Sequence, residues 1–93
     1  MSYRLKFKDE ALKEWRKLDG PLREQFKKKL EERLQEPRMP AAKLSGHADR
    51  YKIKLKTSGY RLVYEVRDAE VVVVVVAVGK RERNAVYVAA AKR

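Results

Sequence analysis

The stretch from Tyr51 to Val66, YKIKLKTSGYRLVYEV, constrains the fold more than any other part of the chain. In its first half, apolar residues alternate with three lysines, a period of two that is typical of a strand with one buried and one exposed face. Gly59 ends the polar turn that follows, and glycine adopts the positive φ that tight hairpin turns require. Because the alternation resumes from Tyr60, this stretch predicts a β-hairpin.

The exposed face of that hairpin is cationic. If the apolar side chains of both strands enter one core, Arg61 lies on the same face as Lys52 and Lys54. Cross-strand neighbours lie about 5 Å apart, and like charges at that distance destabilise the pair. The hairpin therefore predicts a surface that binds something anionic.

The length and composition predict one small intracellular domain. A chain of 93 residues suffices for a single core, so we expect residues 1–93 to form one domain. It has no cysteine for disulfides or thiolate metal sites. The first ten residues lack the apolar stretch of a signal peptide, and the longest apolar run, Val71 to Val78, is too short to cross a bilayer. We expect a soluble, cytoplasmic protein.

The positive charge is concentrated in two segments. The net charge is +11, from 24 basic and 13 acidic residues. Residues 50–67 hold six basic residues and one acidic residue, and residues 79–93 hold five and one. Such clustering predicts a polyanionic partner, for which nucleic acid is the first expectation. An anionic membrane is the weaker alternative, because no basic amphipathic helix has an aromatic face; a role in solubility alone is the third.

The segments before the hairpin predict a strand and two helices. Residues 3–8 alternate between apolar and basic, which indicates a strand with its odd-numbered residues inward. Asp9 can cap the next helix, whose apolar residues continue at helical spacing to Leu18. Pro21 fits the first turn of a second helix, which has apolar residues at intervals of four and ends before Pro37.

The remaining segments predict a loop, a strand and a helix. Residues 37–50 show no periodicity and form a loop, in which the only histidine, His47, is expected to be solvated rather than catalytic. The unbroken run from Val71 to Val78 predicts a central strand buried on both faces and ended by Gly79. Residues 84–91 are alanine-rich and compatible with a helix.

The predicted order is thus β-α-α-β-β-β-α, which indicates a small α+β domain. We expect a two-helix hairpin on one face of a mainly antiparallel four-stranded sheet, and a concave basic surface on the other face.

Missing motifs narrow the chemistry that this surface could perform. The chain has no glycine-rich phosphate loop, no Ser-His-Asp order, and too few histidines for a two-histidine ribonuclease. No metal site is expected, because the lone histidine has no partner at ligand spacing. Lysine, arginine and tyrosine could still cleave RNA through its 2′-hydroxyl, since neighbouring cations favour the neutral form of a lysine. The residue pattern alone leaves both an RNA-cleaving enzyme and a non-catalytic nucleic-acid-binding module open.

Five stretches together resemble the RelE family of toxins from bacterial type II toxin-antitoxin pairs. They are ALKEWRKL at 11–18, REQFKKKL at 23–30, AAKLSG at 41–46, YKIKLKTSGYRLVYEV at 51–66 and VGKRERNAVY at 78–87. The resemblance implies a microbial-ribonuclease-like fold and a ribosome-dependent endoribonuclease that cuts messenger RNA in the decoding site without metal or cofactor. It also implies a RelB-like antitoxin as partner, and binding of operator DNA only as the toxin-antitoxin complex.

The resemblance further implies which residues act. Lys52 and Lys54 would activate the 2′-hydroxyl and stabilise the phosphorane, and Arg61 would hold the scissile phosphate. Arg81 would act as acid or charge stabiliser at the leaving oxygen, and Tyr87 would stack on or orient the nucleotide. Further RNA contacts are expected from Lys43, Lys56, Lys80 and Arg83, while Ser45 stands where relatives often carry a basic residue. The alternatives are a ParE-like toxin that inhibits a protein without cutting RNA, and a plain nucleic-acid-binding module.

Overall fold

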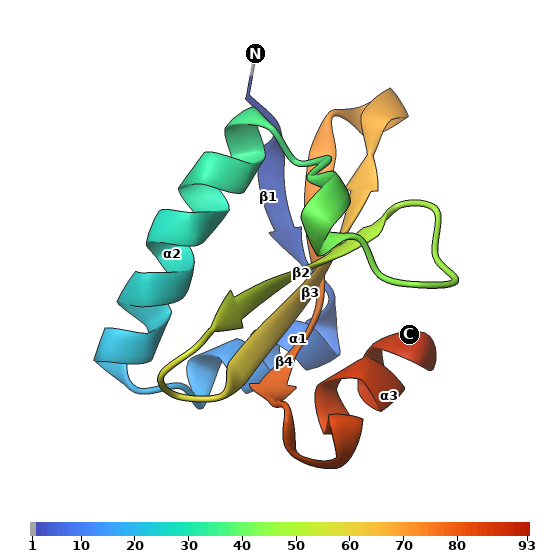
Figure 1. The fold of residues 1–93 in the computed structure, drawn as a ribbon. Helices are drawn as coiled ribbons and strands as arrows, with labels where there is room; N and C mark the ends of the chain where they lie inside the picture. The colour runs from blue at the N-terminus through green and yellow to red at the C-terminus, as the bar shows by residue number, and fades with distance from the viewer. Residues whose placement is uncertain (1) are drawn as a thin grey trace.

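The protein is a sheet of four strands with helices on both faces (Figure 1). The computed structural model describes residues 2–93. The elements follow the predicted order β-α-α-β-β-β-α: β1 (Arg4–Phe7), α1 (Asp9–Arg16), α2 (Gly20–Gln35), β2 (Arg50–Leu55), β3 (Tyr60–Arg67), β4 (Val72–Lys80) and α3 (Ala85–Ala91). Short 3-10 turns occupy Pro40–Ala42, Asp68–Glu70 and Glu82–Asn84.

The sheet has the order β1-β4-β3-β2. Only β1 and β4 run parallel, so the sheet is mainly antiparallel, as predicted. The valine run forms the central strand and is buried on both faces, which confirms the interpretation of its unbroken apolar pattern. The strand does not end at Gly79, however. It continues to Lys80, because β3 still pairs there, with Arg61 opposite Gly79 and Tyr60 opposite Lys80.

One face of the sheet packs against α1 and α2, as expected. Phe26 and Leu30 of α2 are almost completely buried in the same cluster as Ile53 and Leu62 of the hairpin. Trp15 of α1 contacts Phe26, with ring centroids 6.3 Å apart. These aromatic side chains therefore belong to the core.

The start of α1 differs from the prediction, whereas the start of α2 has a capping side chain. Asp9 was expected to cap α1 but is its first helical residue, and the N-cap is Lys8, whose side chain makes no capping bond. The backbone N–H of Lys8 is still bonded to Val75 of β4, so the helix begins directly where the strand pairing stops. At α2, Asp19 Oδ1 accepts a hydrogen bond from the Leu22 N–H (2.9 Å).

Leu5 and Phe7 of β1 lie on the core face, as predicted, but Leu5 is incompletely covered. Tyr3 and Phe7 pack against the core, but Leu5 is 37% exposed. The strand has only four residues and pairs with a neighbour on one side only, so the core covers its middle incompletely.

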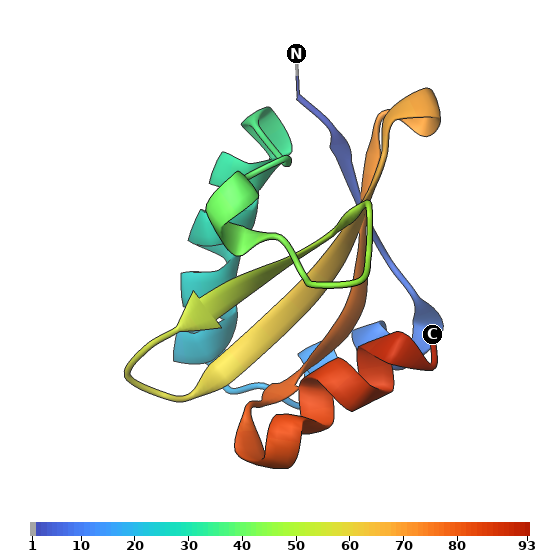
Figure 2. The same ribbon diagram turned by 45° about the vertical axis from the view of Figure 1, so that its right-hand side comes forward.

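The second face of the sheet is not the open basic surface that the sequence predicted, because α3 covers part of it. Val86 and Ala90 of α3 pack against Val63 of β3 and against Val76 and Ala77 of β4. Figure 2 shows α2 and α3 on opposite sides of the sheet. The apolar residues on this face require a cover, and the cationic surface is restricted to the end of the hairpin.

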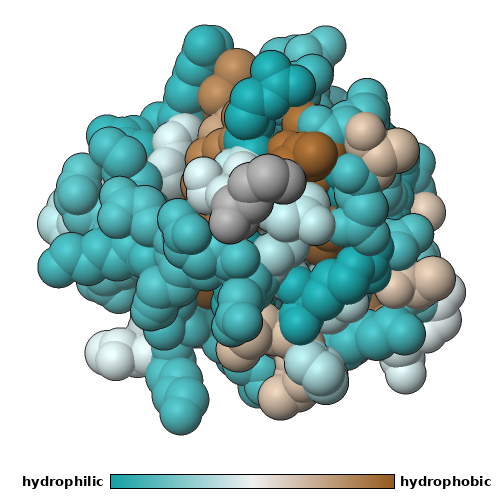
Figure 3. Space-filling model, turned by 90° about the horizontal axis from the view of Figure 1, so that it is seen from above, coloured by the Kyte–Doolittle hydropathy of each residue, from teal (hydrophilic) through white to brown (hydrophobic). Residues whose placement is uncertain are grey.

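The face of the molecule seen from above is mostly hydrophilic (Figure 3). Polar side chains cover most of this face, and hydrophobic ones show only in small patches between them (Figure 3). Among residues 2–93, none of the helices has the length and apolar character needed to cross a membrane.

Candidate functional site

A pocket of about 390 Å³, here called the basic pocket, lies beside α3 at the cationic end of the hairpin. It brings together all five residues for which the resemblance implied catalytic roles. Its lining consists of Leu44, Ser45, Lys52, Lys54, Arg61, Arg81, Asn84 and Tyr87. Leu44 and Asn84 were not predicted from the sequence to belong to the site.

The hairpin supplies three of the cations. Lys54 is paired directly with Arg61 across β2 and β3, so their side chains lie on one face, as the alternation predicted. Lys52 is two residues from Lys54 and is on the same side of β2. The Lys54 side chain is exposed and that of Lys52 is half-buried, whereas Arg61 is only 8% exposed. Arg61 therefore forms the floor of the pocket.

Arg61 is held by the backbone and keeps donors free. Its Nη1 donates to the carbonyl oxygens of Tyr60 (3.0 Å) and Leu55 (3.5 Å). Its Nε is buried and has no hydrogen-bond partner among the described residues. A buried donor without a partner costs free energy, so this arginine is suited to an anion that enters the pocket.

Arg33 of α2 supports the hairpin from the opposite side. Its Nη1 donates to the carbonyl oxygen of Lys52 (3.1 Å) and to the hydroxyl of Tyr64 (3.0 Å). The Tyr64 hydroxyl donates in turn to the carbonyl oxygen of Pro37 (2.7 Å), and burial raises the pKa of this phenol. The backbone that carries Lys52 is thereby tied to the helical layer.

A strained turn places Arg81. The Arg81 N–H donates to the carbonyl oxygen of Gly59 in the hairpin turn (3.0 Å), and the Asn84 N–H donates to Arg81 (2.7 Å). Arg83 and Asn84 both adopt left-handed backbone conformations, with φ of 52° and 56°. Non-glycine residues rarely do so, and two in succession reverse the chain sharply between β4 and α3. This turn brings Arg81 back to the hairpin.

Tyr87 depends on α3, which is fastened by the end of the chain that follows it. Arg93 Nη1 donates to Glu14 Oε1 (2.7 Å) and to the carbonyl oxygen of Val76 (3.1 Å). Glu14 Oε1 also accepts from the Val78 N–H (3.0 Å), and Lys8 Nζ donates to the carbonyl oxygen of Arg93 (2.6 Å). The hydrogen bond to Glu14 is the main reason that the pKa of Arg93 is raised. The side chains of Arg93 and Glu14 thus bond to β4 at Val76 and Val78, after Val75, the last residue of β4 that pairs with β1.

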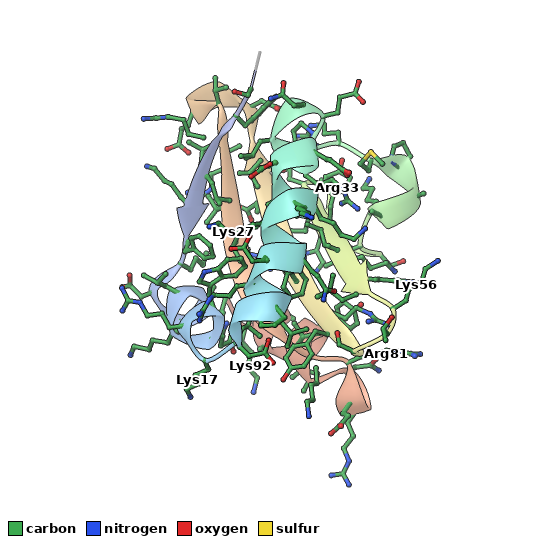
Figure 4. All side chains as sticks on the ribbon, turned by 90° about the vertical axis from the view of Figure 1, so that its left-hand side faces the viewer. Lys17, Lys27, Arg33, Lys56, Arg81 and Lys92 are labelled. Atoms are coloured by element: carbon green, nitrogen blue, oxygen red, sulfur yellow. The ribbon has the colours of Figure 1, made fainter. Side chains whose placement is uncertain are left out.

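The four residues expected to make further RNA contacts are divided between several places. Lys80 and Arg83 line a second pocket of about 440 Å³, here called the adjoining pocket, which also includes Arg81 and Asn84. Lys56 does not line either pocket and points outward at the hairpin turn (Figure 4). Lys43 lines a different hollow together with His47, so neither side chain forms part of the basic pocket.

Within the part of the chain that the structure describes, no group of three or more histidine, cysteine, aspartate or glutamate side chains could hold a metal ion.

Comparison with known proteins identifies the family. Residues 5–85 match the family model described as the ParE toxin of the type II toxin-antitoxin system parDE. The chain is 61% identical over 93 residues to the mRNA interferase toxin RelE of Escherichia coli (strain K12), and the match covers 100% of this chain and 98% of that protein. The chain belongs to the RelE family of toxins.

Solved RelE structures confirm the fold. A mutant of the E. coli toxin RelE in the free state superimposes with a TM-score of 0.93 at 59% identity, covering 100% of this chain and 98% of that one. An E. coli RelBE toxin-antitoxin complex matches with a TM-score of 0.85 at 61% identity, covering 88% of this chain and 100% of the other. The resemblance drawn from the sequence is therefore confirmed. The RelE relatives favour the nuclease hypothesis over the ParE-like inhibitor.

Proposed function

We propose that this RelE-family toxin is a ribosome-dependent mRNA interferase, with residues 1–93 acting as one toxin domain. The observation that carries the proposal is the convergence of Lys52, Lys54, Arg61, Arg81 and Tyr87 on one pocket. A pocket of four cations and one tyrosine suits a reaction in which charge accumulates on a phosphate. The full-length similarity to the E. coli mRNA interferase supports the same conclusion.

The reaction requires only groups that the pocket contains. The ribose 2′-oxygen attacks the adjacent phosphorus, and a lysine, Lys52 or Lys54, accepts the proton of that hydroxyl. The bond between phosphorus and the 5′-oxygen then breaks and the leaving oxygen takes up a proton from solvent, so the products carry a 2′,3′-cyclic phosphate and a 5′-hydroxyl. Arg61, with its free buried donor, stabilises the phosphorane during this change.

Arg81 and Tyr87 complete the site from the other side of the pocket. A guanidinium keeps its proton at physiological pH, so Arg81 contributes mainly by stabilising charge on the leaving 5′-oxygen. Tyr87 is half-buried on α3 and provides an aromatic face on which a base can stack. The exposed Lys54 and Arg81 remain accessible to a nucleic acid that approaches the pocket.

The partners follow from the proposed reaction and from charge. The decoding site of the ribosome would present the messenger RNA in the cytoplasm, and the net charge of +11 supports association with RNA. The same charge suits an acidic RelB-like antitoxin, and the E. coli RelBE complex is a structural relative. Operator DNA would be bound only by the toxin-antitoxin complex.

The test is cleavage of a messenger RNA placed in the decoding site of purified ribosomes with EDTA present, beside the same RNA without ribosomes. Wild type should cut within the decoded codon only on ribosomes. Arg81→Ala should lower the rate on the order of 10² or more with near-normal ribosome binding. Lys27→Ala removes an exposed charge on α2, and should leave the rate unchanged (Figure 4).

Two results would contradict the proposal. Equal losses of binding and rate in Arg81→Ala would indicate that the cations only hold RNA. No cleavage by folded, toxic wild-type protein would favour an inhibitor of the ParE type.

A further inference from the structure

Asn84 is the only asparagine in the chain, and it lies where two pockets meet. It lines the basic pocket together with the proposed catalytic residues, and it also lines the adjoining pocket with Lys80 and Arg83. Arg81 is the only other residue that lines both. A nucleotide that continues from one pocket into the other would therefore pass this side chain.

The Asn84 amide is free for a ligand. Asn84 occupies the N-cap position of α3, where asparagine commonly accepts a backbone hydrogen bond, but its left-handed backbone (φ 56°, ψ 27°) prevents this and no capping bond forms. The side chain is exposed and makes no hydrogen bond within residues 2–93. Its backbone N–H donates to the carbonyl oxygen of Arg81 in the turn, so the side-chain amide is the group left to bind a ligand.

The chemistry of the amide differs from that of its neighbours. Lysine and arginine side chains in the two pockets attract phosphate whatever the base, and stacking on Tyr87 tolerates any base. An asparagine amide offers one acceptor and two donors side by side, the combination that pairs with a base edge. Among the residues shared by both pockets, Asn84 is the neutral one that can distinguish one base from another.

We infer that Asn84 is a specificity-determining residue, which hydrogen-bonds to the edge of a base flanking the scissile phosphate and so sets the codon preference. The inference rests on the proposed mRNA interferase function. A second explanation for an asparagine at this position is that the backbone requires it, because asparagine and glycine adopt left-handed conformations more readily than other residues. The two explanations can be separated by substitution.

Asn84→Gly keeps the backbone conformation accessible and removes the amide. Asn84→Asp keeps the shape and the tolerance for this conformation but replaces the amide donors by an acceptor oxygen. Single-turnover cleavage is measured on ribosomes programmed with a panel of decoding-site codons that differ by one base. Lys27→Ala serves as the control, because it is distant on α2 and should preserve the wild-type ranking.

We expect the ratios of cleavage rates between codons to change, rather than the overall cleavage rate. Asn84→Gly should narrow the spread between the fastest and slowest codons on the order of tenfold, and Asn84→Asp should change which codons are cut fastest. A wild-type ranking retained in both variants, with rates lowered equally on every codon, would reduce Asn84 to a backbone role and overturn the inference. Equal wild-type rates on all codons would do the same. Absence of any wild-type cleavage would instead overturn the proposed function, and the inference with it.

Discussion

Replacing Arg93 by alanine should loosen α3, and with it Tyr87, without altering any residue of the basic pocket. The Arg93 guanidinium joins Glu14 of α1 to the carbonyl oxygen of Val76 in β4, and α3 ends two residues before it. The substitution removes the donor that bonds to Glu14 and to the Val76 carbonyl oxygen, and it also removes the ion pair of Arg93 Nε with Glu10 Oε2 (3.2 Å). In the variant α3 would still be held by the buried side chains of Val86 and Ala90, and by the hydrogen bond from Arg50 Nη1 to the Ala90 carbonyl oxygen (2.6 Å).

The magnitude follows from the burial of the pair. The Arg93 side chain is 14% exposed and that of Glu14 is 30% exposed, so solvent screens the interaction only in part. A hydrogen bond to a charged group contributes about 1.5–3 kcal/mol, and the bonds that share one guanidinium are not additive. We therefore expect Arg93→Ala to lower the free energy of unfolding by about 2 kcal/mol. For a chain of this size, that is a fall in Tm of roughly 8–16 °C.

The assay combines thermal unfolding with cleavage on programmed ribosomes. If the lost free energy is concentrated in the attachment of α3, a change of about 2 kcal/mol raises the fraction of molecules in which α3 is detached roughly 30-fold. The cleavage rate kcat should then fall while KM, which depends on the exposed cations, changes little. Lys92→Ala is the matched control, because it removes one exposed charge beside Arg93 and should leave both Tm and kcat unchanged.

A double-mutant cycle decides whether the pair itself is responsible. Glu14→Gln keeps an acceptor for the Val78 N–H but removes the charge that Arg93 binds. The combined variant should be less destabilised than the two single effects added, by about 1 kcal/mol or more. Additive effects, or a normal kcat in an Arg93→Ala protein whose Tm has fallen, would refute the reasoning.

Two further predictions concern stability. Phe26→Ala should lower the free energy of unfolding by about 3–5 kcal/mol in urea, because the ring is completely buried and the cavity cannot close fully; a smaller loss than Ile→Val substitutions give would contradict this packing. Burial alone would raise the pKa of Glu65, but hydrogen bonds from Arg67 and Arg50 outweigh it and hold the pKa below its ordinary value of 4.5. This carboxylate therefore stabilises the fold above about pH 4.5 and loses its contribution as pH falls through the folded pKa. Glu65→Gln should flatten the pH dependence of unfolding in that range, and an unchanged profile would exclude the effect.

The local pattern of the sequence was sufficient for the hairpin and the central strand. Alternation with a period of two places Lys54 and Arg61 on one face wherever the pair of strands forms, since side chains of a strand point to opposite sides in turn. An unbroken apolar run must be covered on both faces, so Val72 to Val78 had to lie at the centre. The resemblance to the RelE family added Arg81 and Tyr87, whose catalytic roles stay predictions.

Contacts between distant segments were decided only by the tertiary structure. Glu14 and Arg93 are 79 residues apart, and no periodicity relates them. The covering of Val63 by α3, and the exposure of Leu5, depend on how far each layer extends over the sheet, which no single segment specifies. Asn84 is an ordinary turn residue in the sequence, and it gains its position between two pockets only because the turn bonds to Gly59 of the hairpin. Local periodicity determines which face of an element is apolar, whereas the meeting of two elements depends on the packing of the whole chain.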